Sequence, residues 1–411
     1  MSTLLSISVF LANFIDYRIW IFSIGDIAII ALVLLSLPYF KFKKIKIRPL
    51  EAIGLSLIAV GLLLSLAMNF SKDYFSLFDY FASSAKLGLY LAAIYIVPNT
   101  LKKYKIKCTK IIENFIVFVV ASGLLQLLII VAFGRDCWPL YSLGSHYFGL
   151  TTENTLFTWE GLVRVRSFYS EPAHFAVHIS MLYSLLLFSE KKLRIVTHIS
   201  YVIGIISTSA LSGFAIMAAI YCLFFIKYLI QKRSKKAIFT ASACFAGTVG
   251  LLFANGNIRE RIFNLFKLKD ASGVTRTIGG FFFLKYSPWY GTGPGNSVNF
   301  FMSFSSLPEI EQKWFESTGE FFNNILLSII ILGYIGALGF LVYQFAVLKK
   351  HKILFFALMA IHFGWGKLFD APIWFFLLLY IAICDPYDDE PVWFVRQKAK
   401  KSPLKSAEKQ S

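Results

Sequence analysis

Residues 102–133 read KKYKIKCTKIIENFIVFVVASGLLQLLIIVAF, and this stretch decides the class of fold. Five lysines are followed by a run of 23 residues, 111–133, in which Glu113 is the one charged side chain. A helix of about 20 apolar residues is long enough to cross the hydrocarbon core of a bilayer. The stretch therefore predicts a membrane-spanning helix that follows a basic loop.

Apolar runs of this kind recur along the whole chain. The composition, 57% hydrophobic and 16% charged among 411 residues, excludes a water-soluble enzyme, a disordered chain and a disulfide-rich scaffold. We expect an all-α fold, a polytopic bundle of about 11–12 transmembrane helices. Residues 2–17 form either a short interfacial helix or the twelfth span. The other predicted spans are 19–40, 50–70, 77–98, 172–189, 195–209, 211–230, 237–254, 321–348, 353–369 and 371–384.

Basic residues concentrate in every second loop. Because short basic loops stay on the cytoplasmic side of a membrane, they predict a cytoplasmic C-terminus. The formal charge of +18 is therefore a label of topology and gives no reason to expect a nucleic-acid partner. The loops 41–49, 102–110, 191–194, 227–236 and 349–352 and the tail after residue 384 hold 27 of the 41 lysines and arginines.

The two longest connections then lie on the outer face. Both are rich in Trp, Tyr and Gly with charges of either sign, which is typical of functional loops. The predicted organisation is N-terminal transmembrane helices (1–133), a first large outer loop (134–171), central transmembrane helices (172–254), a second large outer loop (255–320), C-terminal transmembrane helices (321–384) and a cytoplasmic tail (385–411).

A polar cluster ends the first outer loop, where residues 164–178 read RVRSFYSEPAHFAVH. The proline suits the first turn of the next helix, so Glu171 and His174 are expected at its outer end. Arg164 and Arg166 carry forks of donors that match phosphate oxygens. The alternative interpretation is that the arginines reach lipid headgroups and that Glu171 pairs with one of them.

A glycine-rich turn marks the second outer loop, where residues 288–296 read PWYGTGPGN. Closely spaced glycines allow backbone amides to approach a ligand, although such turns are also common without one. The candidate substrate contacts are Gly293, Gly295 and Asn296 in this turn and Glu320 and Asn323 at the start of the next span.

Together these motifs resemble the O-antigen polymerase family. The shared pattern is Arg-x-x-x-Phe-x-x-Glu-Pro-x-x-Phe-Ala opening a span, a later Arg276, Gly-x-Gly-Pro-Gly-Asn, and Asn-x-x-Leu followed by Gly333 and Gly336. The resemblance extends over nearly the whole chain in its layout of spans and loops. The related O-antigen ligases carry a His-Asn pair where this chain has Phe322-Asn323, which favours the polymerase interpretation.

The resemblance implies a glycosyltransferase of the bacterial cytoplasmic (inner) membrane, with its active site facing the periplasm. It would transfer a growing glycan of O-antigen, capsule or exopolysaccharide from undecaprenyl pyrophosphate to the terminal sugar of another lipid-linked repeat unit. Such a donor brings its own leaving group, so we expect no cofactor and no metal. The implied partners are the undecaprenyl-pyrophosphate-linked oligosaccharide, the lipid bilayer and a chain-length regulator protein.

This reaction needs cations for the diphosphate and a base for the attacking hydroxyl. Arg166 and Arg276, with Arg164 assisting, are the candidates for the cations. Glu171 is the first candidate for the base and His174 the second. The aromatic residues that either stack on sugar faces or anchor the interface are Tyr169, Trp289 and Tyr290.

Three other functions are consistent with the sequence. An O-antigen ligase shares the layout but not the Phe322-Asn323 pair. A lipid-linked oligosaccharide flippase would carry cations among its spans, where Lys86 is the clearest basic residue. The third is a membrane anchor or assembly partner without catalysis.

Overall fold

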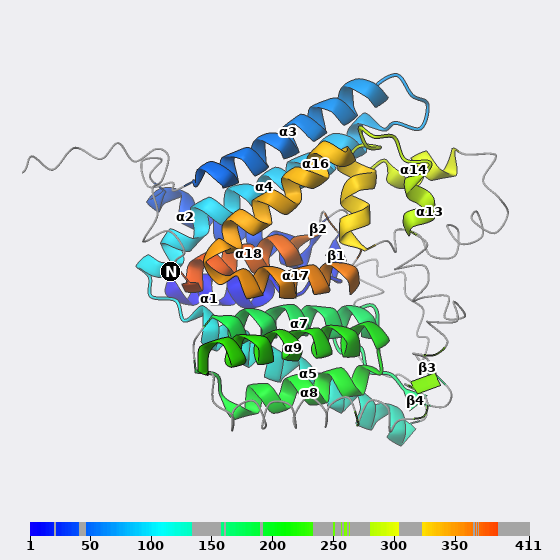
Figure 1. Ribbon diagram of the computed structural model, residues 1–411. Helices are drawn as coiled ribbons and strands as arrows, with labels where there is room; N and C mark the ends of the chain where they lie inside the picture. The colour runs from blue at the N-terminus through cyan, green and yellow to red at the C-terminus, as the bar shows by residue number, and fades with distance from the viewer. Residues whose placement is uncertain are drawn as a thin grey trace, which may run out of the picture.

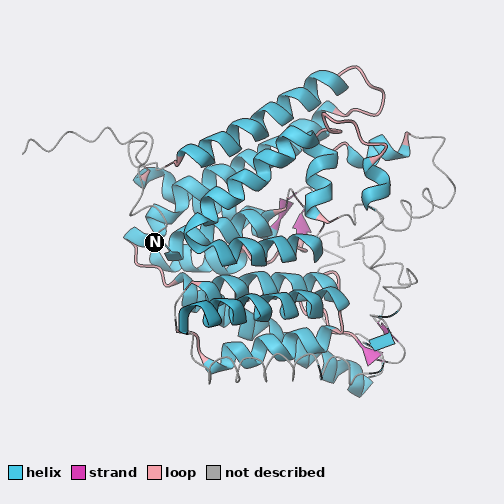
Figure 2. Cartoon of the chain, viewed as in Figure 1, coloured by secondary structure: helices cyan, strands magenta, loops and turns pink. Residues whose placement is uncertain are grey.

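The computed structural model describes residues 1–19, 22–40, 47–133, 158–159, 162–189, 192–232, 280–303, 323–364 and 371–384, together with residues 250, 256, 259–260, 263, 366, 368 and 370. Within this part of the chain nearly all regular structure is helical, and strand is limited to two antiparallel pairs (Figure 2). The expected all-α fold is confirmed for these residues.

The elements fall into an N-terminal, a central and a C-terminal series along the chain. The N-terminal elements are α1 (Ser2–Leu11), β1 (Arg18–Ile19), β2 (Phe22–Ser23), α2 (Ile24–Ser36), η1 (Leu37–Tyr39), α3 (Pro49–Asn69), α4 (Leu77–Lys103) and α5 (Cys108–Phe133). The central elements are β3 (Thr158–Trp159), β4 (Leu162–Val163), α7 (Pro172–Phe188), α8 (Ile195–Thr208) and α9 (Leu211–Lys232). The C-terminal elements are α13 (Gly280–Leu284), α14 (Ser297–Met302), α16 (Asn324–Leu348), η4 (Lys349–His351), α17 (Lys352–Gly364) and α18 (Ala371–Cys384).

Among the described residues, five helical segments are long and apolar enough to cross a membrane. They are Pro49–Asn69, Leu77–Lys103, Cys108–Phe133, Leu211–Ile230 and the continuous segment Asn324–Gly364. The first four match predicted spans, and the fifth joins the predicted spans 321–348 and 353–369 through η4. Shorter apolar helices correspond to the predicted spans 19–40, 172–189, 195–209 and 371–384. Most of the predicted span 237–254 lies outside the described residues.

The outward faces of these helices carry large apolar side chains. Several of them are more than 60% exposed, which would be unfavourable against water and suits contact with lipid tails. The clearest examples are Leu63 in α3, Leu128 and Val131 in α5, and Ile230 in α9. The hydrophobic composition of the chain and the apolar side chains on its surface therefore both favour lipid as the medium around the bundle.

Three groups of helices are seen in Figure 1. α3, α4 and α16 form one group, α5, α7, α8 and α9 form a second, and α1, α2, α17 and α18 lie between them. α1 starts at the end of the bundle where η4 lies and has ten residues, about 15 Å in length. The N-terminus is therefore at the end of the bundle that carries the basic stretch Lys349–His351.

Glycines allow α3 and α16 to pack at close range. A Cβ atom on Gly61 would lie 2.6 Å from Gly336 Cα, and one on Gly339 would lie 2.6 Å from Ile58 N. Small residues at helix crossings are typical of membrane proteins, because backbone contact replaces the hydrophobic effect as the source of packing energy. This crossing holds the C-terminal helices against the N-terminal ones.

α16 is broken at Gly333, which has φ 69° and ψ 178°. The carbonyls of Ile330 and Ile331 lose their helical donors there, and they accept hydrogen bonds from Thr292 N (2.8 Å) and Gly293 N (3.0 Å). Tyr334 N, which would have bonded to Ile330, donates instead to Trp289 O (3.0 Å). The glycine turn at 288–296 thus fills the break with backbone donors and an acceptor.

We predict that Gly333→Ala lowers stability by about 2 kcal/mol or more, because an L-residue is strained at this φ and ψ. Its Cβ would also meet Trp289 O at 2.5 Å. Gly88→Ala in α4 is the matched control: nothing lies within 4 Å of the added Cβ, so stability should stay equal or rise. Thermal unfolding of both variants in detergent measures the difference, and equal midpoints would contradict the prediction.

Candidate functional site

A rigid loop precedes α7 and carries the two arginines of the first motif. Gln126 of α5 accepts hydrogen bonds through Oε1 from Arg166 N (3.2 Å) and Ser167 N (2.9 Å). Ser167 has a left-handed φ of 52°, and its hydroxyl donates to Val119 O at 2.7 Å. One glutamine side chain therefore fixes the backbone from which Arg166 projects.

Arg164 and Arg166 differ in accessibility. Arg164 is partly exposed, and its Nε donates to Thr208 O at the end of α8 (3.1 Å). Arg166 is 1% exposed and lies within the bundle. Both cations thus lie on the loop that leads into α7, and in this conformation Arg164 is the one nearer to solvent.

The start of α7 agrees with the sequence motif. The helix begins at Pro172, and Glu171 is its N-cap residue with extended backbone angles. Glu171 and His174 are both partly exposed and stand at the same end of the helix as the arginines. The two candidate bases and two of the three candidate cations are thus carried by one segment of eleven residues, 164–174.

Asp16 joins this group from the far end of the sequence and was missed by the sequence analysis. Its Oδ2 accepts hydrogen bonds from Ser170 N (2.8 Å) and from Ser170 Oγ (3.0 Å), and it lies 3.4 Å from His174 Nδ1. Ser170 Oγ is 2.8 Å from His174 Nδ1. The available signal was a carboxylate in a long apolar segment, since such residues in membrane proteins are usually paired and functional.

Tyr169 is packed against protein on its ring faces. The ring stacks on Phe175 with centroids 5.4 Å apart and is tilted against His178 at 5.5 Å. Burial raises the pKa of Tyr169 well above its ordinary range, and Asp16 and Tyr17 raise it further, so the hydroxyl stays protonated. With 1% exposure the ring is not open to a sugar in this conformation, and substrate binding by Tyr169 stays a prediction.

The glycine turn packs against α3, α4 and α16, and not against the loop that carries Arg164 and Arg166. Asn296 Oδ1 accepts from Ser76 N (2.6 Å), and Asn296 Nδ2 donates to Ser76 O (3.2 Å), which ties the turn to the start of α4. Gly293 packs on Phe75 and Tyr80, and Gly295 on Asp79. These residues therefore have a structural role, and their contact with substrate stays a prediction.

The remaining candidates are one exposed aromatic residue, one helix cap and two residues outside the described part of the chain. Trp289 is 53% exposed, so its ring is accessible from outside the protein. Asn323 Oδ1 accepts from Leu326 N (2.9 Å) and caps α16. Arg276 and Glu320 lie outside the described residues. No three histidine, cysteine or carboxylate side chains within the described ranges are placed to hold one metal ion.

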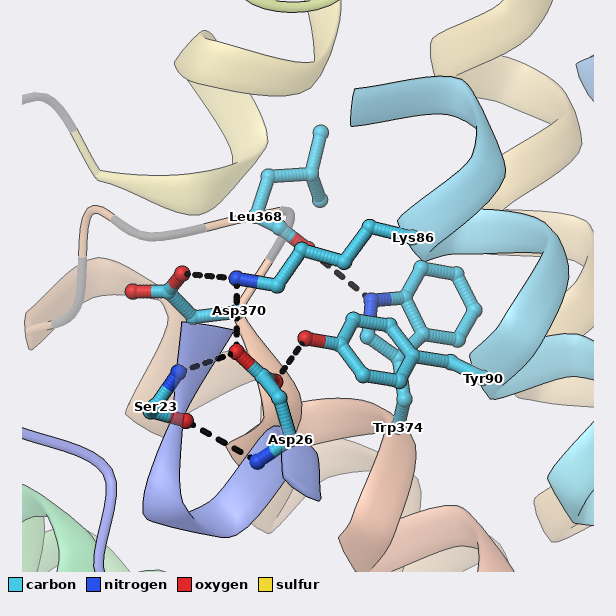
Figure 3. A network of polar contacts seen from close by, with 7 residues as sticks. All are labelled: Ser23, Asp26, Lys86, Tyr90, Leu368, Asp370 and Trp374. Atoms are coloured by element: carbon cyan, nitrogen blue, oxygen red, sulfur yellow. Dashed lines mark hydrogen bonds and ion pairs between the residues drawn. The ribbon is translucent and has the colours of Figure 1, made fainter. Parts of the chain in front are cut away.

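A second charged cluster lies between α2, α4 and the start of α18, around the buried Asp26 (Figure 3). Lys86 Nζ lies 3.0 Å from Asp26 Oδ2 and 3.3 Å from Asp370 Oδ1. Tyr90 donates its hydroxyl to Asp26 Oδ1, and Ser23 N donates to Asp26 Oδ2 at 2.8 Å. Lys86 therefore binds two carboxylates, which differs from the cavity-facing cation expected of a flippase.

The N-terminal hairpin, whose described residues are 12–19 and 22–26, connects the two charged groups. Phe14 O accepts from Gly25 N and Tyr17 O accepts from Ile24 N, both at 2.8 Å. This pairing places Asp16 toward the start of α7, while Asp26 contacts α4 and the start of α18. Residues 2–17, predicted to form either a short interfacial helix or a twelfth span, and the start of the predicted span 19–40 thus link both polar groups.

We predict that Lys86→Met destabilises the protein by about 3–5 kcal/mol, because it leaves the fully buried carboxylate of Asp26 and the partly exposed one of Asp370 without their shared cation. The double variant Lys86→Met with Asp370→Asn should recover part of this loss, since one of the two charges is then removed. Thermal unfolding of the wild type and of the single and double variants in detergent gives the comparison. Unchanged stability in Lys86→Met would show that the cluster is energetically neutral.

Comparison with known proteins gives no relative for this chain. No family model, no curated protein and no solved structure matches it. The function of the site is therefore inferred from its own residues and geometry.

Proposed function

We propose that this protein is a polysaccharide polymerase of the bacterial inner membrane. It transfers the growing glycan from undecaprenyl pyrophosphate to the terminal sugar of another lipid-linked repeat unit at the periplasmic face. The observation that carries the proposal is the grouping of Arg164, Arg166, Glu171 and His174 at one helix start, held in place by Gln126 and Asp16.

Each part of this group matches one demand of the reaction. Arginine forks bind the oxygens of a diphosphate and stabilise the negative charge that grows on it as the sugar leaves. Glu171 or His174 takes the proton of the attacking hydroxyl. Because Arg166 is buried, side chains around it must move before a diphosphate reaches it, and Arg164 meets the donor first.

The apolar surface of the bundle supports a lipid-linked substrate. A polyprenyl chain is soluble only in the bilayer, so its diphosphate lies at the membrane surface, where the outer helix ends stand. The flippase alternative is less well supported, because Lys86 is already bound by Asp26 and Asp370. The ligase alternative has no described residue in its favour.

We predict that Arg166→Ala and Arg276→Ala each abolish long-chain polysaccharide, with a loss of rate of roughly 100-fold or more. Arg166→Lys keeps the charge but not the fork, and should retain only part of the activity. The measurement is a gel of surface polysaccharide from a strain that lacks this protein and carries each variant.

The gel pattern separates the candidate functions. A single capped repeat unit in the strain without the protein supports a polymerase, whereas the absence of any transferred glycan points to a ligase or flippase. Arg194→Ala is the matched control, because Arg194 binds Glu113 (3.0 Å) and Asn114 (2.8 Å) near the start of α8 and has no part in the proposed site. Normal long chains from Arg166→Ala and Arg276→Ala, with both variants present in the membrane, would refute the arginine roles.

A further inference from the structure

Two contacts of His174 Nδ1 favour one tautomer of its neutral imidazole. An ionised carboxylate can only accept hydrogen bonds, so Ser170 Oγ–H points to Asp16 Oδ2, 3.0 Å away. A hydroxyl has one proton, and Ser170 Oγ is then an acceptor toward His174 Nδ1 at 2.8 Å. Each donor among these groups has an acceptor when Nδ1 carries the proton of the neutral imidazole. The lone pair of the ring is then on Nε2.

We propose that Asp16 is a positioning residue that acts through Ser170 to make His174 Nε2 the base of the glycan transfer. This inference rests on the proposed function and selects His174 over Glu171. The Asp16 side chain is 4% exposed and the His174 side chain is 12% exposed, so the imidazole is the more accessible of the two.

The proposed step balances without a cofactor. The acceptor hydroxyl oxygen attacks the anomeric carbon of the donor, and the new C–O bond forms as the bond from that carbon to the diphosphate oxygen breaks. The electron pair of the broken bond leaves with undecaprenyl pyrophosphate. The hydroxyl proton passes to His174 Nε2 and afterwards to the departing diphosphate or to water.

The surrounding charges suit this role. Asp16 lies 3.4 Å from the imidazole, Glu171 precedes His174 by three residues, and Arg164 and Arg166 are the cations of the described residues just before α7. The arginines precede His174 by eight to ten residues on a fixed backbone. A diphosphate held by the arginines would therefore lie at the same end of the bundle as the proposed base.

Kinetics of the purified full-length protein with lipid-linked repeat units test the inference. Asp16→Asn should lower kcat by roughly 100-fold while KM changes less than about twofold, because the imidazole loses its orientation but substrate contacts remain. Asp16→Glu should restore part of kcat. Wild-type kcat in Asp16→Asn would overturn the inference.

A double-mutant cycle separates positioning from structural support. If Asp16 acts through His174, adding Asp16→Asn to the His174→Gln variant should lower kcat by less than about a further twofold. Additive losses would assign Asp16 a structural role only. A larger loss in Glu171→Gln than in His174→Gln would assign the proton to Glu171.

Two further readouts keep the outcomes distinct. Glu113→Gln is the matched control, because Glu113 is also a nearly buried carboxylate that accepts from a backbone N–H, Arg194 N at 2.9 Å, and it should keep wild-type kcat. Nitrogen-15 NMR of the histidines, assigned with His174→Gln, should show protonated Nδ1 in the wild type and a mixture in Asp16→Asn. A wild type that forms no polymer overturns the proposed function, whereas a wild type that polymerises as fast as Asp16→Asn overturns this inference alone.

Discussion

Polar groups inside this bundle must find partners within the chain, because neither lipid nor an apolar core supplies hydrogen bonds. The break in α16 shows the constraint most directly. Gly333 interrupts the helix and frees two carbonyls and one N–H, and residues 289–293 supply a partner for each of them. The turn is therefore part of the packing of the C-terminal helices, and the exposed Trp289 is one of its residues.

The same constraint explains the role of the N-terminal hairpin. Its two carboxylates, Asp16 and Asp26, are buried at 5% and 0% exposure, and each reaches donors on other helices. Asp16 binds Ser170 before α7, and Asp26 binds Lys86 and Tyr90 of α4. Because both carboxylates come from one short segment, the two groups of helices on either side of it are tied together by hydrogen bonds and an ion pair.

Much of the helical layout could be predicted from apolar runs and basic loops, since span length depends on bilayer thickness and not on tertiary contacts. The start of α7 at Pro172 was also predictable, because proline suits the first turn. The break inside α16 could not be predicted, because residues 321–348 read as one apolar run. The break depends on a turn about 40 residues earlier in the chain. Asp16 was missed for the same reason: its partner Ser170 is 154 residues away.

The sequence by itself determined the class of molecule and the residue types at the candidate site, because composition and short motifs are local properties. Only the tertiary structure decided that Arg166 is buried while Arg164 is partly exposed, that the glycine turn fills a broken helix, and that Asp16 and Ser170 hold the imidazole of His174. Burial and hydrogen-bond partners depend on which distant segments meet, and no local pattern in the chain records those meetings.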